Sequence, residues 1–147
     1  MNSFRRVVFD TSTLVGAALK PGSVLHQALM QALARCEVCA SIQTWLELDR
    51  VMQRDRFDRY LARSERSDFV ALLRSYLHFY LVTPEDESAL QPPCRDAKDN
   101  KFLALAQVCR ADILVSSDDD LLVLHPRREV HVLGPVGFLL RAGVGGT

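Results

Sequence analysis

Two aspartates in this chain follow directly on short apolar runs. Asp10 comes after Val-Val-Phe, and Asp118 comes after Ile-Leu-Val-Ser-Ser. If both runs are parallel β-strands, their carboxyl ends meet at one edge of the sheet, where open α/β sheets bind their ligands. We therefore expect the two carboxylates to lie close together if their strands are neighbours.

Glu47 and Asp99 are two further acids that could join this site. Glu47 lies in an expected helix, about 40° from Val51 at ~100° per residue, which places it at the margin of the core-facing stripe. Asp99 opens another expected helix, and Asp96 lies one turn before it. The helix dipole favours an acid in a first turn, which is a purely structural explanation for Asp99.

Each acid has a structural explanation of its own, and only the combination favours chemistry. Asp10 could end a strand and cap the next helix, Glu47 could be partly solvated, and residues 118–120 could form a solvated turn. Carboxylates that gather raise one another's pKa and repel, and a divalent cation removes this conflict. Because every candidate ligand is an oxygen, Mg²⁺ or Mn²⁺ suits the set better than zinc. The histidines lie outside these stretches, so nothing indicates a Ser-His-Asp arrangement.

The elements that must position these acids alternate between short β-like runs and helical stretches, which favours an α/β fold with a parallel sheet. The expected strands are Arg5–Phe9, Glu37–Ala40, Phe79–Val82, Asp112–Val115 and Val130–Leu133. The expected helices are Ser23–Arg35, Ser41–Gln53, Asp55–Ala62, Ser64–Leu77, Asp99–Arg110, Asp119–Leu124 and Pro135–Arg141, before a frayed tail at Gly143–Thr147. Ser23 and Ser41 are expected to be helix N-caps. The chain shows no repeat or linker, so we expect residues 1–147 to form a single domain.

Composition narrows the class of protein. Apolar residues make up 48% of the chain, enough for a core without disulfides or metals. No apolar run reaches the ~20 residues of a membrane span, and the N-terminus lacks the shape of a signal peptide, so we expect a cytoplasmic protein. Cys36 and Cys39 form a CxxC pair, but Cys94 and Cys109 do not form a second one. We therefore expect the cysteines to pack structurally rather than to bind zinc or do redox work.

Charge is unevenly distributed along a chain whose net charge is zero. Residues 50–74 hold seven arginines and four acids, whereas residues 85–120 hold nine acids and four basic residues. Arginine suits bidentate contact with phosphate, so the first segment is a candidate nucleic-acid surface. A solvated helix face in an arginine-rich protein explains the same composition equally well.

Four stretches, taken in order, resemble the motifs of PIN domains. The first is Val7-Val-Phe-Asp-Thr-Ser12, an apolar strand followed by Asp-Thr-Ser, and the second is Ser41-Ile-Gln-Thr-Trp-Leu-Glu-Leu48, a Ser-capped helix that carries an acid. The third is Asp96-Ala-Lys-Asp-Asn-Lys-Phe-Leu-Ala-Leu-Ala106, and the fourth is Ile113-Leu-Val-Ser-Ser-Asp-Asp-Asp-Leu-Leu122. The resemblance extends from Val7 to Leu140. The third stretch is especially similar to bacterial PIN proteins of the VapC-type group, the toxins of toxin–antitoxin pairs.

The resemblance implies a three-layer α/β/α fold with a central parallel sheet of about five strands. It also implies a catalytic and metal-binding quartet, made of Asp10, Glu47, Asp99 and Asp118. The implied accessory residues are Ser12, Asp96, Ser116 and Asp120. The fourth motif commonly has Thr where this chain has Ser116, and often Gly or Arg where it has Ser117. Serine keeps the hydroxyl, so we expect the function to survive.

By the same resemblance, the chain is expected to be a Mg²⁺- or Mn²⁺-dependent endoribonuclease. It is also expected to be the toxin of a toxin–antitoxin pair, to have a small antitoxin as its partner and to form a homodimer. Basic residues near the acids are the expected RNA contacts: Lys98, Lys101, Arg50 and Arg54. Two alternatives stay open, a non-catalytic PIN scaffold that binds proteins and a PIN nuclease that processes RNA without an antitoxin. A receiver-like module is disfavoured because Thr-Pro ends the third expected strand and no Lys follows the fifth.

Overall fold

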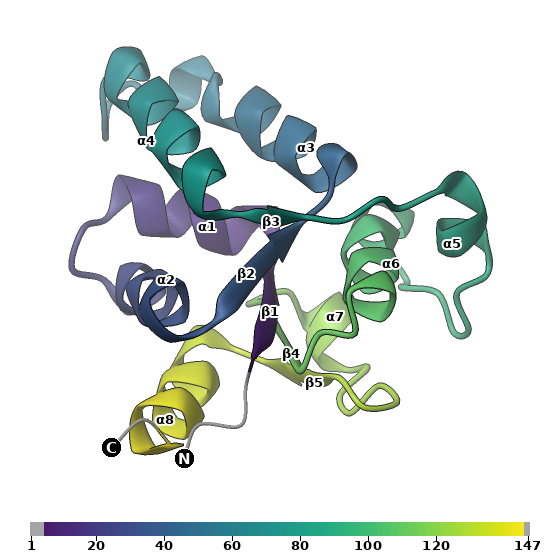
Figure 1. The fold of residues 1–147 in the computed structure, drawn as a ribbon. Coiled ribbons are helices and arrows are strands. Elements are labelled where there is room, and N and C mark those ends of the chain that lie inside the picture. The colour runs from purple at the N-terminus through teal and green to yellow at the C-terminus, as the bar shows by residue number, and fades with distance from the viewer. Residues whose placement is uncertain (1–4, 146–147) are drawn as a thin grey trace.

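A five-stranded parallel sheet forms the centre of the protein in a computed structural model that describes residues 5–145, with side chains through Arg141 (Figure 1). The strands are β1 (Arg6–Phe9), β2 (Glu37–Ala40), β3 (His78–Phe79), β4 (Ile113–Val115) and β5 (His131–Leu133), in the order β3-β2-β1-β4-β5. Phe9 pairs with Val115, so β1 and β4 end side by side. The predicted parallel α/β fold is confirmed.

Helices cover both faces of the sheet and complete three layers (Figure 1). One face carries α1 (Thr11–Leu19), α2 (Val24–Arg35), α3 (Ile42–Met52), α4 (Arg63–Tyr76) and α8 (Pro135–Gly145). The other face carries α5 (Pro84–Ser88), α6 (Asn100–Val108) and α7 (Asp119–Leu122). Short 3₁₀ turns, Asp55–Phe57 and Ala97–Asp99, precede α4 and α6.

Strand β1 is buried on both sides because its successive side chains enter different cores. Val7 and Phe9 pack in the core beneath the first helical layer, and Val8 packs in the core beneath the second. Two-sided burial of this kind explains the near-continuous apolar run that precedes Asp10. The strand end is therefore rigid, and the residue after it is held in a defined place.

Several local predictions hold because they depend on hydrogen bonds within a few residues. Ser23 accepts a hydrogen bond from the backbone of His26, and Ser41 forms a capping box with Thr44, so both act as N-caps. Three of the four cysteines, Cys39, Cys94 and Cys109, are buried. None of the described helices is both long and apolar enough to cross a bilayer.

Other predicted elements are wrong in extent. Helix α1 was not predicted, because Thr-Ser-Thr-Leu-Val-Gly-Ala-Ala-Leu mixes β-branched residues and Gly with no helical periodicity. The predicted helix over residues 55–62 is only the turn Asp55–Phe57. The guanidinium of Arg66 donates hydrogen bonds to the carbonyls of Arg54 and Leu61, which helical hydrogen bonds would otherwise use.

The predicted strand ends also shift. Strand β3 is His78–Phe79 rather than residues 79–82, because β2 stops at Ala40 and offers no further pairing. The last helix continues to Gly145, so the predicted tail from Gly143 is helical as far as the described residues extend. Residues 146–147 lie outside them.

Candidate active site

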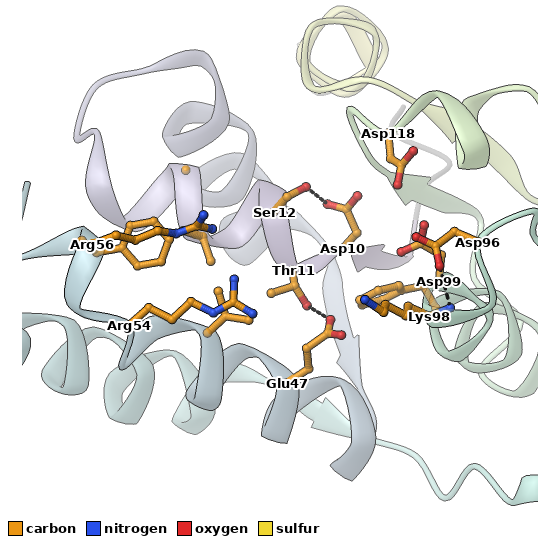
Figure 2. Close-up of a pocket in the computed structure, with 15 residues that line it drawn as sticks. Asp10, Thr11, Ser12, Glu47, Arg54, Arg56, Asp96, Lys98, Asp99 and Asp118 are labelled. Carbon is orange, nitrogen blue, oxygen red and sulfur yellow. Dashed lines mark hydrogen bonds between the residues drawn. The ribbon is translucent and has the colours of Figure 1, made fainter.

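A pocket of about 450 Å³ opens at the carboxyl edge of the sheet. Asp10 and Asp118 reach it from the ends of β1 and β4, and Glu47 reaches it from α3. Asp99 and Asp96 enter from the turn before α6. Figure 2 shows the aspartates on one side of the pocket and Arg54 and Arg56 on the other. Thr11 and Ser12 lie between these two groups. All four members of the predicted quartet therefore line a single pocket.

Asp10 is the most buried acid of the group, with 3% of its surface exposed. One carboxylate oxygen accepts the backbone N–H of Thr13 at 3.0 Å, which caps α1, and the other accepts the hydroxyl of Ser116 at 2.5 Å. Burial raises the pKa of Asp10, and these two hydrogen bonds oppose the rise. Asp10 is thus both a helix cap and a rigidly oriented acid of the pocket.

Asp99 occupies the N-cap position of α6, but its side chain makes no capping hydrogen bond. Its Oδ2 atom is buried and has no hydrogen-bond partner among the described residues. Burial, followed by the adjacent carboxyl of Asp118, raises the pKa of Asp99 to about 7. A cap role therefore does not account for this acid, and its unpartnered oxygen requires another explanation.

Ser116 joins two acids from a fully buried position. Its hydroxyl donates to Asp10 and accepts the backbone N–H of Asp118 at 2.9 Å. Asp118 in turn caps α7 by accepting the N–H of Asp120 at 2.9 Å. The Asp120 side chain does not line the pocket, whereas Asp96 does, as the exposed cap of the turn before α6.

Both carboxylate oxygens of Glu47 are occupied. Thr11 donates its hydroxyl to one oxygen, and Lys101 places its ammonium 2.7 Å from the other. The side chain is only 15% exposed, as expected for a position at the margin of the core-facing stripe. Thr11 was not among the predicted site residues, although it directly follows Asp10 in the first motif.

The basic residues near the acids differ from the predicted set. Arg54 and Lys98 line the pocket as predicted, and Arg56 joins them (Figure 2). Arg50 and Lys101 do not line it: Arg50 is exposed on α3, and Lys101 is held by Glu47 and by the carbonyl of Lys98. The arginine-rich composition of residues 50–74 indicated this segment, but only the turn before α4 decides which side chains face the acids.

The donors fit a hard divalent cation in their chemistry. A hard divalent cation prefers oxygen ligands, it would give the buried Oδ2 atom of Asp99 a partner, and it would offset the neighbouring acids that raise the pKa of Asp99. Across the described residues, the acid side chains do not converge closely enough to form a ready-made cation site. Cation binding would therefore require the acid side chains to move closer together, and Oδ2 of Asp99 has no hydrogen bond to another described residue that would have to break.

The sequence model of the PIN domain matches residues 6–120 of this chain. The chain belongs to the PIN-domain family. No curated protein sequence gives a significant match. PIN domains are nucleases, so family membership supports a hydrolase that acts on nucleic acids.

Solved structures share the PIN fold at low sequence identity. The VapBC2 complex from Rickettsia felis, bound to a DNA fragment from its promoter, is 12% identical with a TM-score of 0.64, covering 88% of this chain and 98% of that one. PAE2754 from Pyrobaculum aerophilum is 13% identical with a TM-score of 0.67, covering 95% and 96%. A sarcin-ricin loop cleaving toxin, VapC20 from Mycobacterium tuberculosis, is 15% identical with a TM-score of 0.55, covering 85% and 98%. At these identities the similarity concerns the fold.

Proposed function

We propose that this PIN domain is a divalent-cation-dependent endoribonuclease whose catalytic acids are Asp10, Glu47, Asp99 and Asp118. The observation that carries the proposal is the Oδ2 atom of Asp99, which is buried with no hydrogen-bond partner among the described residues, in a pocket shared with the other three acids. A purely structural acid at a helix start would cap the helix, and Asp99 does not.

Asp10, Asp99 and Asp118 would hold Mg²⁺ or Mn²⁺, with Glu47 beside them. When bound, such a cation offsets the charge of the carboxylates and of the reacting phosphate, and it makes a coordinated water more acidic. Ser116 fixes Asp10 relative to Asp118, because its hydroxyl donates to the Asp10 carboxylate and accepts the backbone N–H of Asp118. Thr11 and Lys101 hold Glu47 in one orientation at the side of the pocket.

Arg54, Arg56 and Lys98 are the proposed contacts to RNA phosphates, because they are exposed residues that line the same pocket as the acids. Phosphate contacts of this kind orient a strand without reading its sequence. Single-stranded or looped RNA fits best, because its backbone and bases are accessible to an open pocket.

The biological setting that we propose is a cytoplasmic toxin–antitoxin pair in which this chain is the toxin. Two of the similar folds are a VapBC complex and a toxin that cleaves the sarcin-ricin loop, and the sequence itself resembles the VapC-type group. A small antitoxin would be the protein partner, and the active form would be a homodimer. Co-expression with the product of an adjacent small reading frame tests the pairing, and sedimentation tests the dimer.

The catalytic proposal is tested by cleavage of a mixed RNA pool with Mg²⁺ or Mn²⁺, in wild-type protein and in the Asp10→Asn and Asp99→Asn variants. Asparagine also caps helices, so Asp10→Asn removes the charge with little change to α1. Asp68→Asn, at an exposed position of α4, is the matched control. We expect cleavage by wild type and Asp68→Asn, and none with EDTA or in the two pocket variants. Full activity in EDTA would contradict the cation requirement, and inactivity of a folded wild type would favour the non-catalytic scaffold.

A further inference from the structure

Lys101 gives one acid of the pocket an ionic partner that the aspartates lack. Its Nζ atom donates to Oε1 of Glu47 at 2.7 Å. None of the ion pairs among the described residues includes Asp10, Asp99 or Asp118. The protein itself therefore supplies a cation for Glu47, and it supplies none of this kind for the three aspartates.

The ammonium of Lys101 is held by more than its acid. Nζ also donates to the carbonyl of Lys98 at 2.7 Å, and it lies 5.7 Å from the ring centroid of Phe102, a residue that lines the pocket. A cation over an aromatic ring is attracted to it. The side chain is only 20% exposed, so its displacement would break two hydrogen bonds and leave a shielded carboxylate without its counter-ion. These contacts oppose the departure of Lys101 from Glu47.

A divalent cation bound directly to Glu47 would meet this ammonium. Oε2 of Glu47 accepts the hydroxyl of Thr11, which leaves Oε1 as the atom that Lys101 and a metal ion would share (Figure 2). Bonds from Mg²⁺ to oxygen are about 2.1 Å long, and Nζ is 2.7 Å from Oε1, so the two cations would be less than about 5 Å apart. Positive charges at that separation repel, and the shielding from solvent strengthens the repulsion. Direct coordination by Glu47 is therefore disfavoured while Lys101 is present.

The aspartates offer a different environment. Asp10 and Asp118 follow β1 and β4, which pair side by side at their ends, and Asp99 contributes a buried Oδ2 atom that has no hydrogen-bond partner among the described residues. Mg²⁺ usually keeps several water ligands and needs few carboxylates from the protein. Three aspartates are therefore enough for one ion without any help from Glu47.

We propose that Lys101 takes the place of a second divalent cation beside Glu47, so that the pocket binds a single Mg²⁺ or Mn²⁺ ion through Asp10, Asp99 and Asp118. The inference rests on the proposed nuclease function, because it concerns the cation of that same site. Enzymes with two-metal sites hold their ions about 3.5–4 Å apart, and both ions stabilise the reacting phosphate. Here the second positive charge belongs to a side chain, and Glu47 stays a hydrogen-bonded carboxylate beside the ion.

The number of bound ions tests the proposal. Mn²⁺ is titrated into metal-free protein, and the free ion is measured by electron paramagnetic resonance at constant ionic strength. We expect wild type to bind one equivalent and Lys101→Gln to bind two, because the substitution frees Oε1 of Glu47 for a second ion. Two Mn²⁺ ions about 4 Å apart couple magnetically, so the bound spectrum of Lys101→Gln should be that of a coupled pair. An ion bound elsewhere on the surface would not produce this coupling.

Lys98→Gln is the matched control. It removes the same charge from a residue that lines the pocket, but it keeps the backbone carbonyl that holds Lys101 and leaves the pair with Glu47 intact. We expect it to bind one equivalent, as wild type does. Lys101→Gln/Glu47→Gln should also bind one, because the carboxylate for the second ion is gone. Circular dichroism of each variant checks that it is folded, and the count in wild type does not depend on any variant.

The outcomes separate this inference from the function on which it rests. Folded wild type that binds no Mn²⁺ would contradict the cation-dependent function and the inference together. A coupled pair in wild type, or a single equivalent in folded Lys101→Gln, would overturn the role of Lys101 and leave the function standing. A second equivalent in Lys98→Gln or in the double variant would also overturn it, because the gain would then come from the change in charge and not from Glu47.

Discussion

Lys101 and Glu47 form an ion pair, with Nζ 2.7 Å from Oε1, that joins α6 to α3 beside the acidic pocket. Their side chains are only 20% and 15% exposed, so the pair is largely shielded from solvent. Lys101 is therefore a partner of the acid rather than the RNA contact that its position in the sequence suggested. The same pair also ties together two elements that contribute Glu47 and Asp99.

Loss of Lys101 should cost stability, because it leaves the shielded Glu47 carboxylate with Thr11 alone. We expect Lys101→Gln to lower the free energy of unfolding by about 1–2 kcal/mol in urea denaturation. Lys98→Gln, at an exposed position, should change it by less than about 0.5 kcal/mol. The double variant Lys101→Gln/Glu47→Gln should recover part of the loss. Equal effects at the two lysines would show that the ion pair does not stabilise the fold.

Asp99 should make the metal-free protein less stable as pH rises. The pKa of Asp99 is raised from 3.8 to about 7, so the folded state holds a proton that the unfolded state releases at lower pH. The stability that this bound proton gives to the folded state is complete below pH 3.8 and is lost as the pH increases through about 7. Above that pH, Asp99 of the wild type carries a negative charge that burial and the neighbouring acids disfavour, and asparagine does not. We expect Asp99→Asn to be more stable than wild type there by about 1–3 kcal/mol, a range that allows for the partial solvation of the group.

Thermal melts in EDTA near pH 4 and near pH 8 check this expectation. The Asn variant should melt at a higher temperature than wild type only at the higher pH, and Asp68→Asn controls for loss of one negative charge. Added Mg²⁺ should then stabilise wild type more than Asp99→Asn, because only wild type retains the carboxylate. A difference between the variants that does not change with pH would argue against a raised pKa.

Ser116 should matter more for activity than its size suggests, because its hydroxyl positions Asp10 and Asp118 together. We expect Ser116→Ala to lower kcat for RNA cleavage by about 10- to 100-fold, in line with the loss of other groups that orient metal ligands. Ser116→Thr retains the hydroxyl and should retain activity. The exposed neighbour Ser117 supplies the control, and Ser117→Ala should cleave like wild type. Similar rates for the two alanine variants would remove the positioning role.

Arg66 should be the residue on which the turn before α4 depends. Its buried guanidinium holds the carbonyls of Met52, Arg54 and Leu61 together with the Asp58 carboxylate. We expect Arg66→Met to lower the free energy of unfolding by about 3–5 kcal/mol, because several buried acceptors lose their donor. Arg63→Met removes an exposed ion pair with Asp55 and should cost less than about 1 kcal/mol. Chemical denaturation of both variants measures the contrast, and a small loss at Arg66 would contradict it.

Much of the fold could be predicted from the sequence because its signals are local. The cap at Ser41 depends on a partner three residues away, and the apolar run before Asp10 follows from a strand that is buried on both faces. Helix α1 carried no such signal, since its small and β-branched residues become helical only with Asp10 as cap and α2 beside them. Strand β3 was misplaced because its length is limited by the end of β2, which lies far away in the chain.

The sequence by itself determined the order of the strands and helices and the positions of the four acids within them. The order of strands in space then brings the ends of β1 and β4 together. Only the tertiary structure decided the partners of the basic side chains: Lys101 pairs with Glu47, Arg66 holds a turn, and the buried Arg127 donates to the carbonyl of Pro92. Long side chains take their direction from groups that are distant in sequence, so neither composition nor periodicity can specify where they lie.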